Sequence, residues 1–354
     1  PNNFLGTNPE ALERAVQTQG QSLIDGMHNL IADLEANEGE LVVRLADEAA
    51  FEVGGNIATA KGSVVFRNDM LELIQYSPTT ELVHETPIIM FPPWINKYYI
   101  LDLTEKNSLI RWVVDQGYTL FVVSWVNPDA SYANTGLEEY VADGYLKSIE
   151  VVKEITEQPH VNAIGYCIAG TTLALTLSLL KQRGDDSVKS ATFFTALTDF
   201  SEQREFTPFL QNDFIDAIEE EVNDKGILES FIMARTFSFL RANDLVYAPA
   251  VKSYMMGEAP PAFDLLYWNG DGSSLPGKMA IQYLRGLCQD NKFAASSFEL
   301  FGHNLSLDDV DVPLCSVACE TDHIAAWVDC YREIGRARSE ETRLNSSHIG
   351  ASRM

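Results

Sequence analysis

One hexapeptide constrains this chain more than any other part of it: Gly165-Tyr166-Cys167-Ile168-Ala169-Gly170. An apolar run suited to a β-strand precedes it at residues 161–165, and a run with helical spacing follows at residues 171–181. A cysteine after a strand is often a buried apolar residue, but small flanking residues at a strand-to-helix turn are typical of an elbow that exposes a nucleophile. We therefore predict that Cys167 is a nucleophile and that its chemistry is acyl transfer through a thioester.

Strand-like and helix-like segments alternate through the middle of the chain. The expected strands are residues 87–91, 119–125, 161–167, 190–196 and 313–319, and the expected helices are residues 104–116, 137–155 and 171–184. This alternation predicts an α/β fold in which helices cover both faces of a parallel sheet.

Composition and patterning divide the chain into five expected regions. Residues 200–298 are rich in aromatic residues, Met, Pro and Gly, and we expect them to form a cap or lid inserted into the sheet domain. A helix is predicted at residues 7–35, with Asn8 as its N-cap. The regions are an N-terminal helical and extended part (1–75), a first core part (76–199), the insertion (200–298), a second core part (299–335) and a tail (336–354).

The two ends of the chain differ from the rest. Residues 336–354 are net basic, whereas the chain as a whole is acidic, and residues 339–348 resemble a translated sequencing adapter. We expect this tail to be non-native. The chain begins at Pro1 without Met, from which we expect a fragment.

The charge and the cysteines exclude several classes of function. With 25 basic and 51 acidic residues the net charge is −26, which repels nucleic acid and anionic lipid. No apolar run reaches the roughly 18 residues of a membrane span, and the five cysteines, without a C-x-x-C pair, suit a reducing cytoplasm. His303 and His323 lack ligand spacing with the thiols, so we expect neither a metal nor a cofactor.

A nucleophile of this type works with an acid and a histidine that follow it in the chain. Asp322 comes directly after an expected core strand and is the candidate acid, although a turn or cap residue would have the same context. His323 is interpreted as a neighbour that orients this acid. His348 is the only histidine after His323, and it lies in the suspect tail.

The chemistry also requires donors for the negative oxygen that forms on the attacked carbonyl. A free thiol has a pKa near 8.5, so an imidazole must take its proton while a carboxylate orients that imidazole. One oxyanion donor should be the N–H of Ile168, directly after the nucleophile. The second should come from the loop after residue 91, where Pro92 and Pro93 have no N–H and leave Trp94 or Ile95.

Several long segments match, in order, the polyhydroxyalkanoate synthases, most closely their class I type. One is Gly62-Ser-Val-Val-Phe-Arg-Asn68, and another is Glu320-Thr-Asp-His-Ile-Ala-Ala-Trp327. The others are residues 85–102, 124–129 and 261–271, so the resemblance covers about residues 58–329. It implies an α/β-hydrolase fold with an inserted cap.

The resemblance also implies a reaction. Cys167 would carry a growing polyester as a thioester, and Asp322 with a histidine would act on the 3-hydroxyl that attacks the next substrate. The substrate would be a short-chain (R)-3-hydroxyacyl-CoA, with coenzyme A released. Relatives of this kind act as homodimers at the surface of cytoplasmic polyester granules.

Two positions depart from the family pattern, and two other functions fit the same residues. Ala169 replaces a glycine of G-x-C-x-G, and the segment around His348 matches the family's Ser-Gly-His-Ile-Ala-Gly only superficially. A cysteine thioesterase or esterase with the same elbow would transfer the acyl group to water. A granule-coating protein with a relic site is the third possibility, and an intact C-terminal histidine would argue against it.

Overall fold

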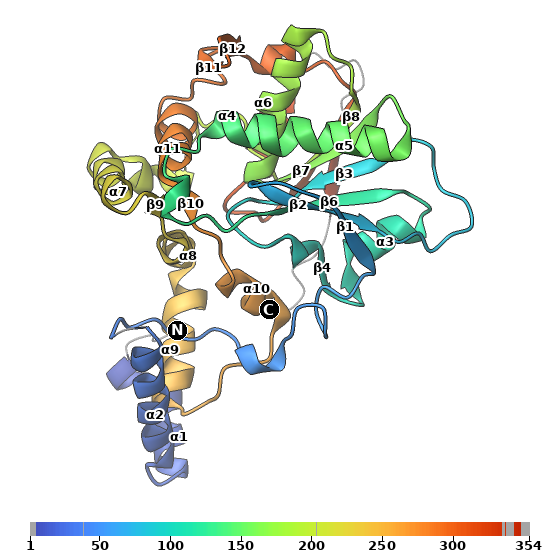
Figure 1. The fold of residues 1–354 in the computed structure, drawn as a ribbon. Coiled ribbons are helices and arrows are strands. Elements are labelled where there is room, and N and C mark those ends of the chain that lie inside the picture. The colour runs from blue at the N-terminus through green and yellow to red at the C-terminus, as the bar shows by residue number, and fades with distance from the viewer. Residues whose placement is uncertain (1–4, 38, 203, 335–336, 338–342, 348–354) are drawn as a thin grey trace. The chain divides into compact units, whose positions relative to one another are not determined.

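An eight-stranded sheet forms the centre of residues 60–230 and 273–354, as the computed structural model shows (Figure 1). The structure describes residues 5–37, 39–202, 204–334, 337 and 343–347. The sheet order is β1-β2-β6-β3-β7-β8-β13-β14. These strands are β1 (Gly62–Arg67), β2 (Leu71–Tyr76), β3 (Ile88–Phe91), β6 (Leu120–Trp125), β7 (Val161–Tyr166), β8 (Val188–Phe194), β13 (Leu314–Cys319) and β14 (Arg343–Ser347).

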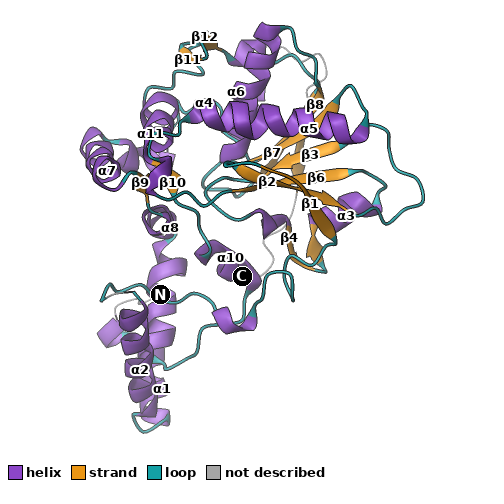
Figure 2. Ribbon diagram, viewed as in Figure 1, coloured by secondary structure: helices purple, strands orange, loops and turns teal. Residues whose placement is uncertain are grey.

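The strand pairing confirms the predicted α/β architecture. All neighbours from β6 to β14 are parallel, and only β1 and β2 join the sheet in antiparallel pairs. Helices cover both faces, with α5 and α6 on one side and α3 on the other (Figure 2). The helices of this sheet unit are α3 (Leu109–Asp115), α4 (Leu137–Glu139), η5 (Tyr140–Leu146), α5 (Lys147–Thr156), α6 (Ile168–Arg183), α7 (Asn212–Lys225), α11 (Gly277–Ile281), η9 (Gln282–Gln289) and α12 (Trp327–Ile334).

Hydrophobic packing explains the positions of the helices around the sheet. Helix α3 turns Ile110, Val113 and Val114 toward Met90 of β3 and Val122 of β6, and all five side chains are buried. Helix α6 is buried nearly all round, which is the pattern of a helix inside a core rather than on a surface. The nucleophile elbow therefore lies between two buried elements.

Residues 1–59 and 231–272 form a second compact unit, which is helical. Its helices are α1 (Pro9–Gln17), α2 (Gln21–Ala36), α8 (Ser230–Leu240), η7 (Asn243–Tyr247), α9 (Ala248–Ala250), η8 (Val251–Met255) and α10 (Asp264–Gly270). Asn8 caps α1 as predicted, because its Oδ1 accepts the Ala11 N–H at 3.0 Å. The single helix expected at residues 7–35 is wrong, since Gln19 and Gly20 adopt positive φ and divide it into α1 and α2.

The compact units follow other boundaries than the expected regions. Strands β1 and β2 lie in the expected N-terminal region but belong to the sheet. The expected insertion is shared, because residues 231–272 join the helical unit and its flanks join the sheet unit. The remaining strands pair two by two: β4 (Asp102–Thr104) with β5 (Asn107–Ser108), β9 (Ile227–Leu228) with β10 (Leu275–Pro276), and β11 (Phe298–Leu300) with β12 (His303–Leu305).

Strand β14 falls within residues 336–354, which the sequence analysis excluded from the fold. It pairs in parallel with β13, from Cys315 opposite Arg343 to Cys319 opposite Ser347. Ladder hydrogen bonds join backbone groups and depend little on side-chain identity. An edge strand can therefore form from a segment whose composition gives no strand signal.

Candidate active site

Cys167 occupies the turn between β7 and α6, as the hexapeptide predicted. Its backbone has φ 54° and ψ −126°, a conformation that residues with a side chain rarely adopt. Strain of this kind gathers at functional sites, where the surrounding structure must hold it in place. The strand–turn–helix context thus fits a nucleophile that the elbow lifts out of the sheet.

Two glycines allow α6 to approach the sheet closely. A Cβ on Gly165 would lie 2.6 Å from the Gly170 Cα, and a Cβ on Gly170 would lie 2.5 Å from the Ala196 Cβ. Ala169, which departs from the family pattern, is fully buried, and its carbonyl accepts the Tyr145 hydroxyl at 2.7 Å. The close approach therefore depends on Gly165 and Gly170 and tolerates a methyl group at residue 169.

Backbone hydrogen bonds fix the elbow. The Cys167 N–H donates to the Phe194 carbonyl at 2.8 Å, and the Cys167 carbonyl accepts the N–H groups of Gly170 and Thr171 at 2.8 and 3.3 Å. Burial raises the pKa of the Cys167 thiol to about 11; the Ile168 N–H, which donates to the sulfur, lowers it, and the charge of Asp322 raises it. The thiol is therefore almost wholly protonated near neutral pH, and the attack needs a base.

Asp322 lies in the loop after β13, where its charge acts on the elbow. Its Oδ1 accepts the N–H groups of Ile324 and Ala325 at 2.8 and 2.9 Å, which fixes the carboxylate. Burial raises the pKa of Tyr166, and the charges of Cys167 and Asp322 raise it further. The fold thus brings the predicted acid near the predicted nucleophile, although 155 residues separate them (322 − 167).

The two predicted histidines have different outcomes. His323 is half-buried and follows Asp322 in the same loop, and its supporting role stays a prediction. His348 lies outside the described residues, directly after the end of β14 at Ser347. Its assignment as the base therefore stays a prediction.

The predicted oxyanion loop follows β3, whose residue Phe91 pairs with Gly165 of β7. Trp94 and Ile95 are both buried. The Trp94 Nε1 donates to the Thr172 Oγ1 at 3.3 Å, so the loop is tied to α6 within two turns of the nucleophile. Among the described residues, neither backbone N–H of this pair has a hydrogen-bond acceptor.

Two further hydrogen bonds hold the same loop from outside. The Trp125 Nε1 at the end of β6 donates to the Pro92 carbonyl at 2.8 Å. The Ser273 N–H donates to the Ile95 carbonyl, also at 2.8 Å. The loop is therefore anchored from three sides, which suits a donor that must not move during a reaction.

Two tyrosines near Cys167 were not among the predicted site residues. Tyr166 stands inside the hexapeptide and could have been found there. Tyr283, in η9, is 116 residues away (283 − 167), yet the charge of Cys167 contributes to its raised pKa after burial and Cys288. No local pattern in the sequence distinguishes Tyr283, because only the fold brings it to the elbow.

The described residues show neither a metal-binding cluster nor a membrane-spanning helix. In that part of the chain, no group of three or more His, Cys, Asp or Glu side chains could hold a metal ion. The helices described there include none long and apolar enough to cross a membrane.

Comparisons with known proteins connect this geometry to a family. Residues 1–113 match the N-terminal region of poly-β-hydroxybutyrate polymerase, and residues 87–349 match the α/β-hydrolase fold. The chain is 44% identical to a poly(3-hydroxyalkanoate) polymerase of Methylorubrum extorquens over 92% of its own length and 54% of the relative. A polymerase subunit of Cupriavidus necator is 39% identical over 94% of this chain and 56% of the relative.

Among solved structures, the mouse α/β-hydrolase domain-containing protein 10 is 11% identical, with a TM-score of 0.43 over 82% of this chain and 90% of that one. The chain spans about half the length of the curated relatives it matches. The two family matches together extend over nearly all of the chain. This chain belongs to the α/β-hydrolase fold family, and over most of its length it is similar to poly(3-hydroxyalkanoate) polymerases.

Proposed function

We propose that this chain carries the catalytic centre of a polyhydroxyalkanoate synthase. It would polymerise (R)-3-hydroxyacyl-CoA, of short chain length as in class I, and release coenzyme A. The single observation that carries this proposal is the strained cysteine of the elbow, which lies within the influence of the Asp322 charge in a chain similar to poly(3-hydroxyalkanoate) polymerases.

The first chemical step loads the enzyme. The Cys167 thiolate attacks the carbonyl carbon of the acyl-CoA thioester, and the new negative oxygen accepts hydrogen bonds from Ile168 and from Trp94 or Ile95. The oxyanion then collapses, the bond to the coenzyme A sulfur breaks, and coenzyme A leaves as a thiol after taking up a proton. Because burial raises the pKa of Cys167 to about 11, a histidine must first remove the thiol proton, and His348 is the candidate.

The second step extends the chain. The 3-hydroxyl of an acyl group gives its proton to a histidine oriented by Asp322 and attacks the thioester of the next unit. One ester bond forms and one thioester bond breaks, so each cycle adds a unit and frees one coenzyme A. Neither metal nor cofactor enters this scheme.

We further propose where the enzyme acts and in what oligomeric state. Apolar side chains project from α1 and α2 and would suit contact with a polyester granule; they are Leu12, Val16, Leu23, Ile24, Met27 and Ile31. We place the enzyme as a homodimer at the granule surface in the cytoplasm. The granule contact is supported by these side chains, and the homodimer by the family resemblance.

Product analysis tests the polymerase proposal against the thioesterase reaction that the same elbow permits. After incubation with (R)-3-hydroxybutyryl-CoA, the coenzyme A released and the free 3-hydroxybutyrate are both measured. A synthase releases coenzyme A with almost no free acid, because the acid units stay in ester linkage. Equal amounts of coenzyme A and free acid would refute polymerisation and support the thioesterase. Release of neither, with the chain folded, would refute both.

A further inference from the structure

Tyr283 contacts both elements that carry the proposed oxyanion donors. Its ring meets the Trp94 ring edge-on, with centroids 5.3 Å apart and an interplanar angle of 86°. Its phenol also lies close to the side chains of Thr171, in the first turn of α6, and of Cys288 on its own helix, and both affect its pKa. Tyr283 thus bridges the loop after β3 and the helix that begins at the nucleophile.

Thr171 is linked to the backbone of Cys167 by a hydrogen bond. The Thr171 N–H donates to the Cys167 carbonyl at 3.3 Å, and its Oγ1 donates to the Leu197 carbonyl at 2.5 Å. These two bonds fix the backbone and the side chain of Thr171 next to Cys167, where the Tyr283 phenol lies close to it.

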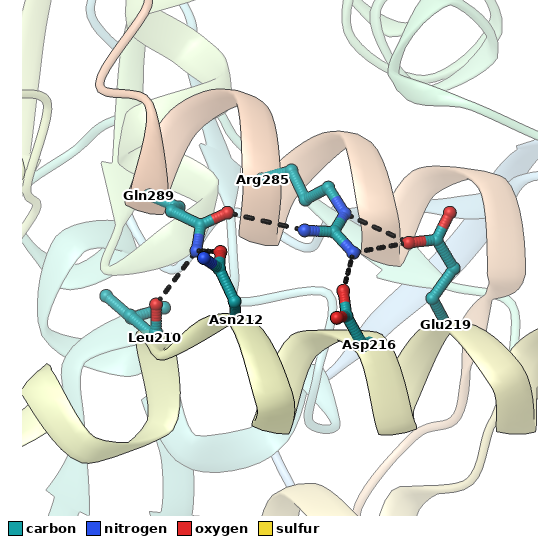
Figure 3. A network of polar contacts seen from close by, with 6 residues as sticks. All are labelled: Leu210, Asn212, Asp216, Glu219, Arg285 and Gln289. Atoms are coloured by element: carbon teal, nitrogen blue, oxygen red, sulfur yellow. Dashed lines mark hydrogen bonds and ion pairs between the residues drawn. The ribbon is translucent and has the colours of Figure 1, made fainter.

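The helix that carries Tyr283 is fixed to α7 by a polar network (Figure 3). Arg285 donates to Asp216 and Glu219, each at 2.6 Å, and Gln289 donates to the Leu210 carbonyl at 3.0 Å. A single exposed ion pair contributes little to the free energy of unfolding. A guanidinium that binds two carboxylates at once nevertheless fixes the position of the helix that carries it. Helix η9 is a π-helix, a form that occurs frequently at functional sites.

The phenol of Tyr283 is also suited to a role that needs no change of protonation state. Burial is the largest cause that raises its pKa well above the ordinary value, and the charges of Cys288 and Cys167 raise this pKa further. The hydroxyl therefore stays neutral above the pH at which a free tyrosine ionises. A phenol of this kind can position groups, but it cannot act as a base.

We propose that Tyr283 is a positioning residue for the oxyanion hole. Its ring packs edge-on against Trp94 and its phenol lies beside Thr171, so that the N–H of Ile168 and that of Trp94 or Ile95 converge on one oxygen. The inference rests on the proposed function for the identity of these donors. Since removal of one donor costs roughly 100- to 1,000-fold in rate, displacement of a donor should cost a part of that.

The test compares two reactions of the Cys167 sulfur. Acylation by p-nitrophenyl acetate passes through an oxyanion, whereas alkylation by iodoacetamide is a displacement at a saturated carbon and forms none. Both rates are measured at pH 10 in the full chain, after subtraction of the rates in a Cys167→Ala variant. Tyr283→Phe, which keeps the ring, should slow acylation about 10-fold, and Tyr283→Leu about 100-fold, within the range of a lost donor. Alkylation should stay within about twofold in both, because no oxyanion donor takes part in it.

Tyr254→Phe is the matched control, because it removes a tyrosine hydroxyl that donates to Asp33 at 2.8 Å within the helical unit. It should leave both rates unchanged. Equal losses of acylation and alkylation in the Tyr283 variants would overturn the inference, since the thiol itself would then have changed. Unchanged acylation in Tyr283→Leu would overturn it as well, as would an equal loss in the control.

The proposed function and the proposed role of Tyr283 can be refuted independently of each other. Acylation by p-nitrophenyl acetate needs no coenzyme A, so a chain that reacts with this ester but not with (R)-3-hydroxybutyryl-CoA would refute the synthase and still report on Tyr283. A folded chain in which neither donor acylates Cys167 would overturn both.

Discussion

At the scale of single residues, Cys167 combines a reactive position with an unreactive resting state. The elbow holds it at positive φ, while burial keeps its thiol protonated. The Ile168 N–H that donates to the sulfur opposes burial only in part. If Cys167 is the nucleophile that we propose, its attack at neutral pH requires a base.

The raised pKa of Cys167 predicts the pH dependence of its alkylation. Below the pKa, the thiolate fraction rises tenfold for each pH unit, so the iodoacetamide rate should rise about 100-fold between pH 8 and pH 10. The Cys167→Ala variant gives the background from the other cysteines. A rate that levels off near pH 8.5, as for a free thiol, would show that burial does not control this sulfur.

Sequence alone could predict the residues of the site where a local pattern marks them. The hexapeptide predicts Cys167 as the nucleophile and Ile168 as one oxyanion donor, and two prolines restrict the predicted second donor to Trp94 or Ile95. Tyr283 could not be predicted, because its contacts with Trp94 and Thr171 depend on how η9 folds back over the sheet unit.

At the scale of elements, the position of α6 depends on two glycines. Gly165 lies in β7, and Gly170 of α6 faces both Gly165 and Ala196 in the loop after β8. The parallel strands could be predicted because buried apolar runs between helices leave few other folds. The division of α1 from α2 and the pairing of β14 could not. Gln19 adopts positive φ without being glycine, and β14 pairs in parallel with β13 at the edge of the sheet.

Gly170→Ala should disturb the elbow by overpacking it. The new Cβ would lie 2.5 Å from the Ala196 Cβ, so α6 must move away from the loop after β8. We expect the free energy of unfolding to fall by about 1–3 kcal/mol, the usual cost of overpacking, as measured by urea denaturation. Gly270→Ala is the control, because a Cβ there has open space. Equal stability of the two variants would contradict the close packing.

At the scale of the whole molecule, the chain forms two compact units that interrupt each other in sequence. Residues 1–59 associate with residues 231–272 through contacts such as Asn29, whose side chain donates to the Ser253 carbonyl at 3.1 Å across 224 residues. Sequence patterns report neighbours along the chain and carry no signal for such a pairing. The boundaries expected from composition therefore differ from these units.

Asp33 should be the residue on which the helical unit most depends. Its fully buried carboxylate accepts a hydrogen bond from the Tyr254 hydroxyl and pairs with Arg44. Asp33→Ala therefore removes the carboxylate on which both of these side chains depend. We expect this change to cost about 2 kcal/mol, as for hydrogen bonds to charged groups, with faster amide exchange in η8. Asp244→Ala, which breaks an exposed pair with Arg241 in the same unit, should cost less than about 1 kcal/mol. A similar cost in both variants would remove the special role of Asp33.

The central claim is that Cys167 carries the growing polyester, and intact-mass analysis after mixing with (R)-3-hydroxybutyryl-CoA tests it most directly. We expect a ladder of hydroxybutyryl units that peptide mapping places on Cys167. The ladder should be absent in Cys167→Ala and unchanged in Cys319→Ala, whose thiol lies at the end of β13. A ladder that survives Cys167→Ala, or a single adduct that never grows, would contradict the account.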